Sequence, residues 1–103
     1  MNKKGITIQK AAEIRTNKDL EPTKLGRMRV FRNMSQSQLA KEAGVTLRAI
    51  QCYEQRVRTI EGAKLRTLLS LCIVLRCSLC DILEDDDTIQ KFCFVNDTFY
   101  YGR

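Results

Sequence analysis

The chain has 103 residues, enough for one domain with at most an added tail. Apolar residues make up 44% and charged residues 29%, a balance that excludes wholesale disorder. No run approaches the ~20 apolar residues of a membrane span, and the N-terminus lacks the apolar region of a signal peptide. We therefore expect a cytoplasmic protein with no membrane partner.

The net charge of +6 is unevenly distributed along the chain. Lysine and arginine outnumber the acids up to residue 80, whereas residues 81–90 hold five acids and no base. A basic protein of this size favours a polyanionic partner, although charge alone is weak evidence for one.

The N-terminal segment, residues 1–22, shows no persistent hydrophobic period and is predicted to be a basic extension. Pro22 suits the first turn of a helix, where its missing N–H costs nothing. That helix is predicted at about 23–32. Asn33 follows it as a left-handed C-cap residue, because asparagine tolerates a positive φ.

Two short helices are predicted next. Ser35 and Gln38 have the spacing of a capping box at the start of a helix over 36–43. Thr46 is a good N-cap for a further helix at about 47–55.

The segment 56–62 is predicted to be a loop, and an apolar helix follows at about 63–75. Ser78 would cap a short fifth helix, which the acidic run at 84–87 would end.

The last residues, KFCFVNDTFYYGR, alternate in polarity, with Asn96-Asp97 as a plausible two-residue turn. They predict a β-hairpin that pairs Phe92 with Tyr101 and Phe94 with Phe99 on one aromatic face. The chain then divides into a basic arm (1–22), a helical domain (23–84) and an acidic link with an aromatic hairpin tail (85–103).

The two short helices predict a rigid elbow. On helices of 3.6 residues per turn, the following residues form one buried seam: Leu39, Ala43, Val45, Ile50 and Tyr53. Ala40 is small enough for the helices to cross closely, and Gly44 can adopt the positive φ of a tight turn. This pattern is typical of a helix-turn-helix, although an ordinary αα-corner in an enzyme or scaffold remains the alternative.

At these residues the chain resembles the lambda-repressor-like, Cro-type DNA-binding domains. The likeness runs from about Leu25 to Leu83, and its markers are Arg29, Met34-Ser35-Gln36, Leu39-Ala40, Gly44-Val45, Ile50, Tyr53-Glu54 and the segment 68–83. The resemblance implies an all-α, five-helix domain whose third helix lies in the major groove of DNA. With the predicted tail, the expected fold is this domain plus a C-terminal β-hairpin.

Four residues of the third helix are candidate base contacts: Leu47, Arg48, Gln51 and Cys52. Counting 100° per residue from Ile50 places the last three on the outward side and Leu47 at the leading edge. The Arg48 fork matches the O6 and N7 acceptors of guanine, and Leu47 suits a thymine methyl group. Gln51 suits adenine or a phosphate, and Cys52 suits only a short apolar or weak polar contact. Solvated surface side chains are the alternative for each.

The candidate phosphate contacts are Ser35, Gln36, Gln55, Arg56 and Arg58. The resemblance implies a phosphate contact for Gln36, at a helix N-terminus that already favours an anion. It also implies a structural ion pair between Arg29 and Glu54. The family usually has glycine where this chain has Arg56, so we expect either a reshaped turn or a longer third helix there.

Three apolar residues, Val30, Phe31 and Ile73, stand where the family often has charged ones. We expect them to be covered by the N-terminal segment around 6–14 or by the aromatic tail.

Five cysteines are an odd number for a disulfide framework, and we expect reduced thiols. Cys77 and Cys80 have a spacing that could suit zinc or redox chemistry, but there is no histidine to complete a zinc site. Buried inert thiols are therefore expected, with no metal and no cofactor.

These features predict a sequence-specific regulator of transcription that binds double-stranded DNA, most simply a repressor of bacterial, phage or mobile-element type. One recognition helix covers few base pairs, so we expect a homodimer on a pseudo-palindromic operator with half-sites ~10 bp apart. The alternatives are an antitoxin-like or adaptor protein whose tail binds a partner, and a thiol or metal sensor. An enzyme is the least expected.

Overall fold

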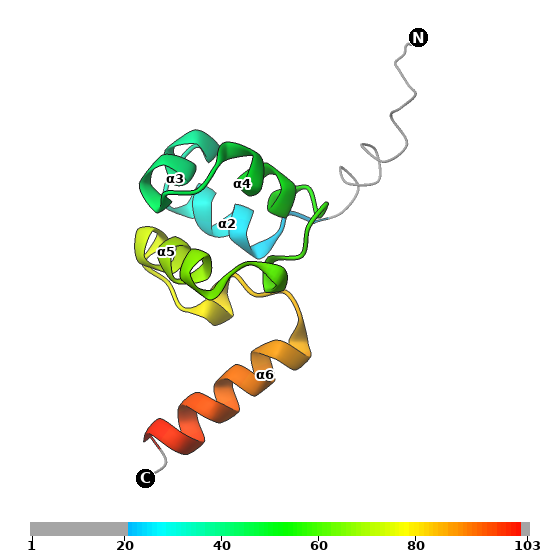
Figure 1. The fold of residues 1–103 in the computed structure, drawn as a ribbon, viewed down its shortest axis with the longest axis vertical. Coiled ribbons are helices and arrows are strands. Elements are labelled where there is room, and N and C mark those ends of the chain that lie inside the picture. The colour runs from blue at the N-terminus through cyan, green and yellow to red at the C-terminus, as the bar shows by residue number, and fades with distance from the viewer. Residues whose placement is uncertain (1–20, 102–103) are drawn as a thin grey trace.

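The computed structural model describes residues 21–101, which are all-helical (Figure 1). The α-helices are α2 (Lys24–Phe31), α3 (Gln36–Ala43), α4 (Leu47–Glu54), α5 (Leu65–Leu75) and α6 (Asp86–Val95). Two 3-10 turns, η1 (Ile60–Gly62) and η2 (Leu79–Asp81), flank α5, and a π-helix, η3 (Asn96–Tyr101), continues α6. Helices α2 to α5 form a compact body, from which α6 projects.

Local side-chain chemistry sets the helix boundaries in the body. Thr23 is the N-cap of α2 and accepts a hydrogen bond from the Gly26 N–H, so Pro22 lies just outside the helix rather than in its first turn. Ser35 and Gln38 form the predicted capping box at the start of α3. Asn33 has the predicted positive φ, at 62°.

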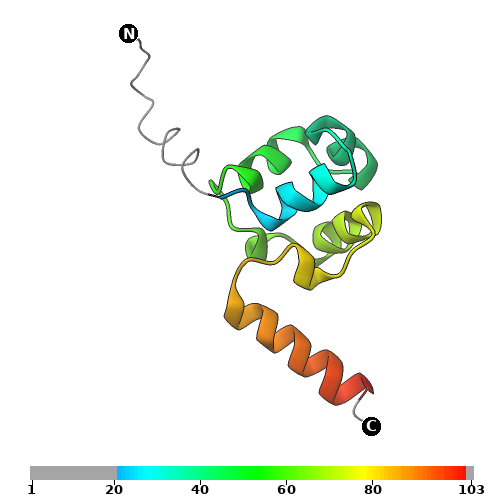
Figure 2. The same cartoon turned by 180° about the vertical axis from the view of Figure 1, so that it is seen from behind.

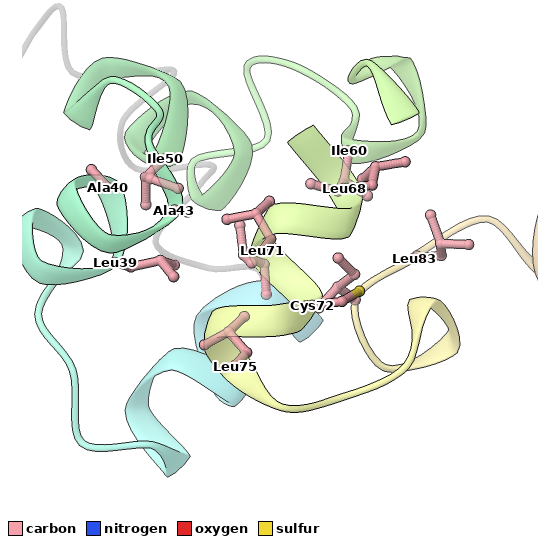
Figure 3. Packing of buried hydrophobic residues seen from close by; sticks show 12 residues of the cluster. Leu39, Ala40, Ala43, Ile50, Ile60, Leu68, Leu71, Cys72, Leu75 and Leu83 are labelled. Atoms are coloured by element: carbon pink, nitrogen blue, oxygen red, sulfur yellow. The ribbon is translucent and has the colours of Figure 1, made fainter. Parts of the chain in front are cut away.

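The core lies where α5 crosses beneath the other helices of the body. Figure 3 shows Leu39 of α3 and Ile50 of α4 on one side, with Leu71 and Leu75 of α5 facing them. All four side chains are essentially inaccessible to solvent, as are Leu25 of α2 and Ile82 after η2. Burial of six such aliphatic groups, each worth roughly 1.5–3 kcal/mol, holds the short helices together.

The predicted fifth helix is reduced to the single turn η2. Ser78 and Asp81 form a reciprocal capping pair around it. The chain then runs through the buried Ile82 and Leu83 to α6. The short helix is thus an anchoring turn for two core side chains.

The C-terminus of α5 ends at an arginine in a left-handed conformation. Arg76 has φ 54°, ψ 55°, a region that costs a residue other than glycine about 1–2 kcal/mol. Arg32 donates from Nε to the Leu75 carbonyl (2.7 Å) and from Nη2 to the Arg76 carbonyl (3.0 Å), which satisfies the end of the helix.

Replacement of Arg76 by glycine is expected to raise the free energy of unfolding by about 0.5–1 kcal/mol. Glycine relieves the strain at positive φ and gives back part of the gain through the greater entropy of the unfolded chain. Urea titration followed by circular dichroism measures the change. Arg76→Ala is the matched control, because alanine keeps the strain. A destabilised Arg76→Gly variant would show that the arginine side chain stabilises the protein by more than its strained backbone conformation costs.

The predicted β-hairpin is wrong, because residues 86–95 form α6 and residues 96–101 continue it as a π-helix. Asp85 caps α6 by accepting from the Thr88 N–H and hydroxyl, which also lowers the pKa of Asp85. Asp86 and Asp87 in the first turn suit the positive end of the helix dipole. The acidic run therefore starts a helix instead of ending one.

Phe94 and Phe99 do meet, but along one helix and not across two strands. Their ring centroids are 5.7 Å apart in an edge-to-face arrangement. The wider π-helical turn brings positions five residues apart onto the same side.

The tail does not cover the apolar residues that were expected to need cover. Val30, Phe31 and Ile73 remain 64%, 74% and 75% exposed. The reason is that α6 projects from the body instead of folding back over α2 or α5, and its contacts with the body are mainly with η2 (Figures 1 and 2). The other proposed cover, the N-terminal segment, lies outside the described residues.

Candidate nucleic-acid interface

The elbow between α3 and α4 is built as predicted. Gly44 has φ 72°, and the Val45 N–H donates to the Ala40 carbonyl at 3.0 Å. Ala40 is only 5% exposed, and Ile50 is fully buried against α3 and α5. No atom lies within 4 Å of a Cβ added to Gly44, so glycine is needed there for its backbone angle and not for space. The two helices are held as one rigid unit.

The free side of α4 presents a small set of side chains. Arg48 and Gln55 are exposed, Leu47 is 39% exposed, and Gln51 is half-buried. The Thr46 hydroxyl accepts from the Ala49 N–H at 3.0 Å and fixes the helix start directly before Leu47 and Arg48. An aliphatic group and a guanidinium fork therefore lie together at the N-terminal end of a short, well-anchored helix.

Cys52 does not share this exposure, and its placement on the outward face is wrong. Its side chain is buried, with 7% exposed. Helix α4 packs against both α3 and α2, so more than one line of residues is covered. The following segment also turns back, and the N–H groups of Val57 and Arg58 both donate to the Cys52 carbonyl.

Arg29 and Glu54 form the ion pair that the resemblance implies. Arg29 Nε lies 2.7 Å from Glu54 Oε2 and Nη2 lies 2.9 Å from Oε1, so the contact is bidentate. Their side chains are 16% and 11% exposed. The hydrogen bond to Glu54 raises the pKa of Arg29. The pair ties α2 to the end of α4.

Gln36 joins this pair, which the sequence did not suggest. Its Nε2 donates to Glu54 Oε1 at 3.1 Å, so three helices meet at one carboxylate. A glutamine amide has two N–H groups, and a single bond to Glu54 leaves the second for another acceptor. The ion pair thereby also orients a donor at the N-terminus of α3.

Ser35 and Arg58 are exposed near the two ends of the elbow. The Ser35 oxygen accepts from the Gln38 N–H, which leaves the hydroxyl proton for an external acceptor.

Arg56 is turned toward the protein. It has φ 63°, so neither a reshaped turn nor a longer α4 avoids the strain expected at this position. Its Nη2 donates to the Glu21 carbonyl at 2.8 Å, and its Nη1 lies 4.0 Å from Glu84 Oε1. These partners compensate the strained backbone and compete with any phosphate.

Two further side chains hold the fold together but were not predicted from the sequence. Arg32 caps α5, and the Glu61 carboxylate accepts the backbone N–H groups of Glu84 and Asp85. Both bonds join segments more than twenty residues apart, so no local pattern could reveal them. Within residues 21–101 no three histidine, cysteine or acidic side chains are grouped to hold a metal ion.

The family model of the Cro/C1-type HTH DNA-binding domain matches residues 24–88, which is more than half of the chain. The chain belongs to this family. No curated protein and no solved structure matches it. As a Cro/C1-type domain, the protein is a DNA-binding regulator with double-stranded DNA as its partner, and its family is generally non-enzymatic. None of the helices described between residues 21 and 101 could span a membrane.

Proposed function

We propose that the protein is a sequence-specific transcriptional repressor of bacterial, phage or mobile-element type that acts in the cytoplasm. The observation that carries this proposal is the contrast along α4: Ile50 is fully buried, whereas Arg48 is exposed at the start of the helix. A helix whose inner side is fixed in this way can present Arg48 to the major groove in one orientation. Repression then follows from occupying the DNA that polymerase needs.

Base reading is assigned to Arg48 and Leu47, with Gln51 at the edge of the contact. Arg48 pairs with the O6 and N7 atoms of a guanine, and Leu47 packs against a thymine methyl group. Cys52 is too buried to take part.

Phosphate contacts are assigned to Ser35, Gln36, Gln55 and Arg58. The first two lie at the N-terminus of α3, where free N–H groups and the helix dipole favour an anion. Arg56 joins them only if it releases the Glu21 carbonyl. The acidic run 84–87 adjoins the segment after α4, since Glu84 Oε1 lies 4.0 Å from Arg56 Nη1, and its charge therefore opposes a phosphate contact at Arg56.

Selection of duplexes from a random pool tests the function. We expect an enriched pseudo-palindrome whose half-sites are ~10 bp apart and contain a guanine read by Arg48. Enrichment of no sequence, with equal retention of every duplex, would contradict sequence-specific regulation.

The homodimer is proposed to form through the exposed side of α5. Leu65, Leu69 and Ile73 recur every four residues along α5 and are 63%, 46% and 75% exposed. Such an apolar stripe is unusual on a helix that is otherwise packed. Two copies of the same stripe can bury each other around a two-fold axis, as a pseudo-palindromic operator requires.

Ile73→Glu is expected to shift the protein from dimer to monomer in sedimentation-velocity experiments, because a carboxylate would be buried in the interface. Val57→Glu is the matched control, since Val57 is 64% exposed outside the stripe. If Ile73→Glu remained a dimer, the interface could not be the apolar stripe of α5.

A partner-binding adaptor is the second candidate, and the exposed tail favours it. Phe94, Val95 and Phe99 are 60%, 56% and 54% exposed on α6 and η3. A partner captured from lysate by the wild type and by Arg48→Ala, but lost in Phe94→Ser/Phe99→Ser, would support this function.

A further inference from the structure

Two thiols from different elements lie in contact at the base of α6. Cys80 Sγ, on η2, is 3.7 Å from Cys93 Sγ, on α6, and both residues are partly accessible. The expectation of buried thiols is therefore wrong for Cys80, and also for Cys77, which is partly accessible as well. We propose that Cys80 and Cys93 form an oxidative modification site, at which a peroxide closes an intramolecular disulfide that tethers α6 to the body. Neither sulfur lies on α3 or α4, so the site is separate from the DNA-facing surface.

Cys80 is on the fixed side of this contact. The Ser78 and Asp81 capping pair holds the turn that contains it. The Lys24 ammonium donates to the Cys80 carbonyl and joins this turn to α2. Ile82 and Leu83, which follow this turn, are buried in the core. The Cys80 sulfur therefore cannot move far.

Cys93 is on the less firmly anchored side of the contact. Within its ten residues α6 has no fully buried side chain, and only Ile89 packs against the core cluster. The helix is joined to the body by the short segment after Leu83, where Glu61 binds the N–H groups of Glu84 and Asp85. A small rotation about this segment can bring Cys93 from 3.7 Å to the ~2.05 Å of a disulfide.

The chemistry needs one equivalent of peroxide. A thiolate of the pair attacks a peroxide oxygen, the O–O bond breaks, and the sulfur becomes a sulfenic acid, while the released hydroxide takes up the proton lost from that thiol and leaves as water. The second sulfur then attacks it and displaces hydroxide, which leaves as water with the proton of the second thiol. In total two thiols and one hydrogen peroxide give one disulfide and two molecules of water.

The other cysteines are protected from this reaction. Cys52 and Cys72 are buried. Burial raises the pKa of Cys72, and it raises the pKa of Cys77 to about 12, so both remain thiols near neutral pH. The hydrogen bond to Cys80 raises the pKa of Cys93 as well, so the reaction is expected to be faster at pH 8.5 than at pH 7. Selectivity for this pair comes from its contact and its accessibility.

The tether should suppress detachment of α6. A disulfide closes the loop from Cys80 to Cys93 and so lowers the entropy of the state in which α6 is detached. The fraction of molecules in that detached state should fall on the order of 100-fold. Lys91 lies inside α6 and is exposed, so trypsin can report the opening by cleaving after it.

The test treats the full-length protein at pH 8.5 with hydrogen peroxide, then maps the peptides by mass spectrometry without reduction. We expect a loss of two hydrogens, a Cys80–Cys93 linked peptide, and cleavage after Lys91 slowed on the order of 100-fold until dithiothreitol is added. Cys80→Ser and Cys93→Ser should each abolish the slowing, whereas Cys77→Ser, the matched control, should keep it.

Three results would overturn the assignment. The first is an unchanged mass after peroxide. The second is a disulfide between other sulfurs or between two molecules. The third is a linked peptide without any change in the rate of cleavage, which would separate the disulfide from the tether.

Discussion

Replacement of Glu54 by alanine is expected to lower the free energy of unfolding by about 3 kcal/mol. The change leaves the Arg29 guanidinium mostly buried beside no carboxylate, and it removes the acceptor of Gln36 as well. Urea unfolding followed by circular dichroism at 222 nm measures the loss. The unfolding slope should stay the same, because the core that is exposed on unfolding is unchanged.

Asp87→Ala is the matched control for this prediction. Asp87 pairs with Lys91 at 3.0 Å, but the two side chains are 72% and 76% exposed. Such an exposed pair within one helix contributes little, because water and salt screen it. If the two variants lost similar, small amounts of stability, the pair at Glu54 would not hold α2 and α4 together.

The second large effect is expected at Arg48. Arg48→Ala should cost about 1–3 kcal/mol in binding to the selected operator and should remove the preference for one base pair. Arg48→Lys keeps the charge but loses the planar fork, so it should keep affinity for phosphates while relaxing the preference. Competition titrations against operators with each base at that position measure both quantities.

Arg66→Ala is the control for charge alone. Arg66 is exposed in the first turn of α5 and is not part of the recognition helix. Its removal should change the affinity for all sequences by the same small factor. An Arg48→Ala variant that weakens every duplex equally would make Arg48 a phosphate contact and leave base reading to other residues.

The elbow could be predicted because its requirements are local. Ser35 with Gln38, Thr46, and Gly44 each meet a need set within four residues, and the structure places all of them as caps or turns. The pairing of Arg29 with Glu54 spans 25 residues and came from the family likeness rather than from any pattern of spacing.

The β-hairpin prediction for the tail was wrong because it rested on aromatic alternation over residues 92–101. In the structure Asp85 accepts from the Thr88 N–H and starts a helix there. A two-stranded hairpin with no third strand is only marginally stable, whereas a capped helix satisfies the hydrogen bonds of its own backbone. The helix is what the structure contains.

The predictions for Cys52 and Arg56 were wrong because they considered the third helix alone. A count of 100° per residue assumes one buried line, but α4 is covered by both α2 and α3. The Val57 and Arg58 N–H groups donate to the Cys52 carbonyl, and the Arg56 side chain donates to the Glu21 carbonyl. These bonds hold a positive φ at Arg56 that a sequence-based argument would assign to glycine.

The most direct test of the account is a titration of a labelled operator, taken from the random-pool selection, with the full-length protein at two salt concentrations. We predict tight binding at low salt that weakens with a slope of about 0.9 in log K per phosphate neutralised, and a preference for the operator over a scrambled duplex that Arg48→Ala reduces. No measurable affinity for either duplex at low salt, or equal affinity for both, would contradict the assignment of α4 as a recognition helix.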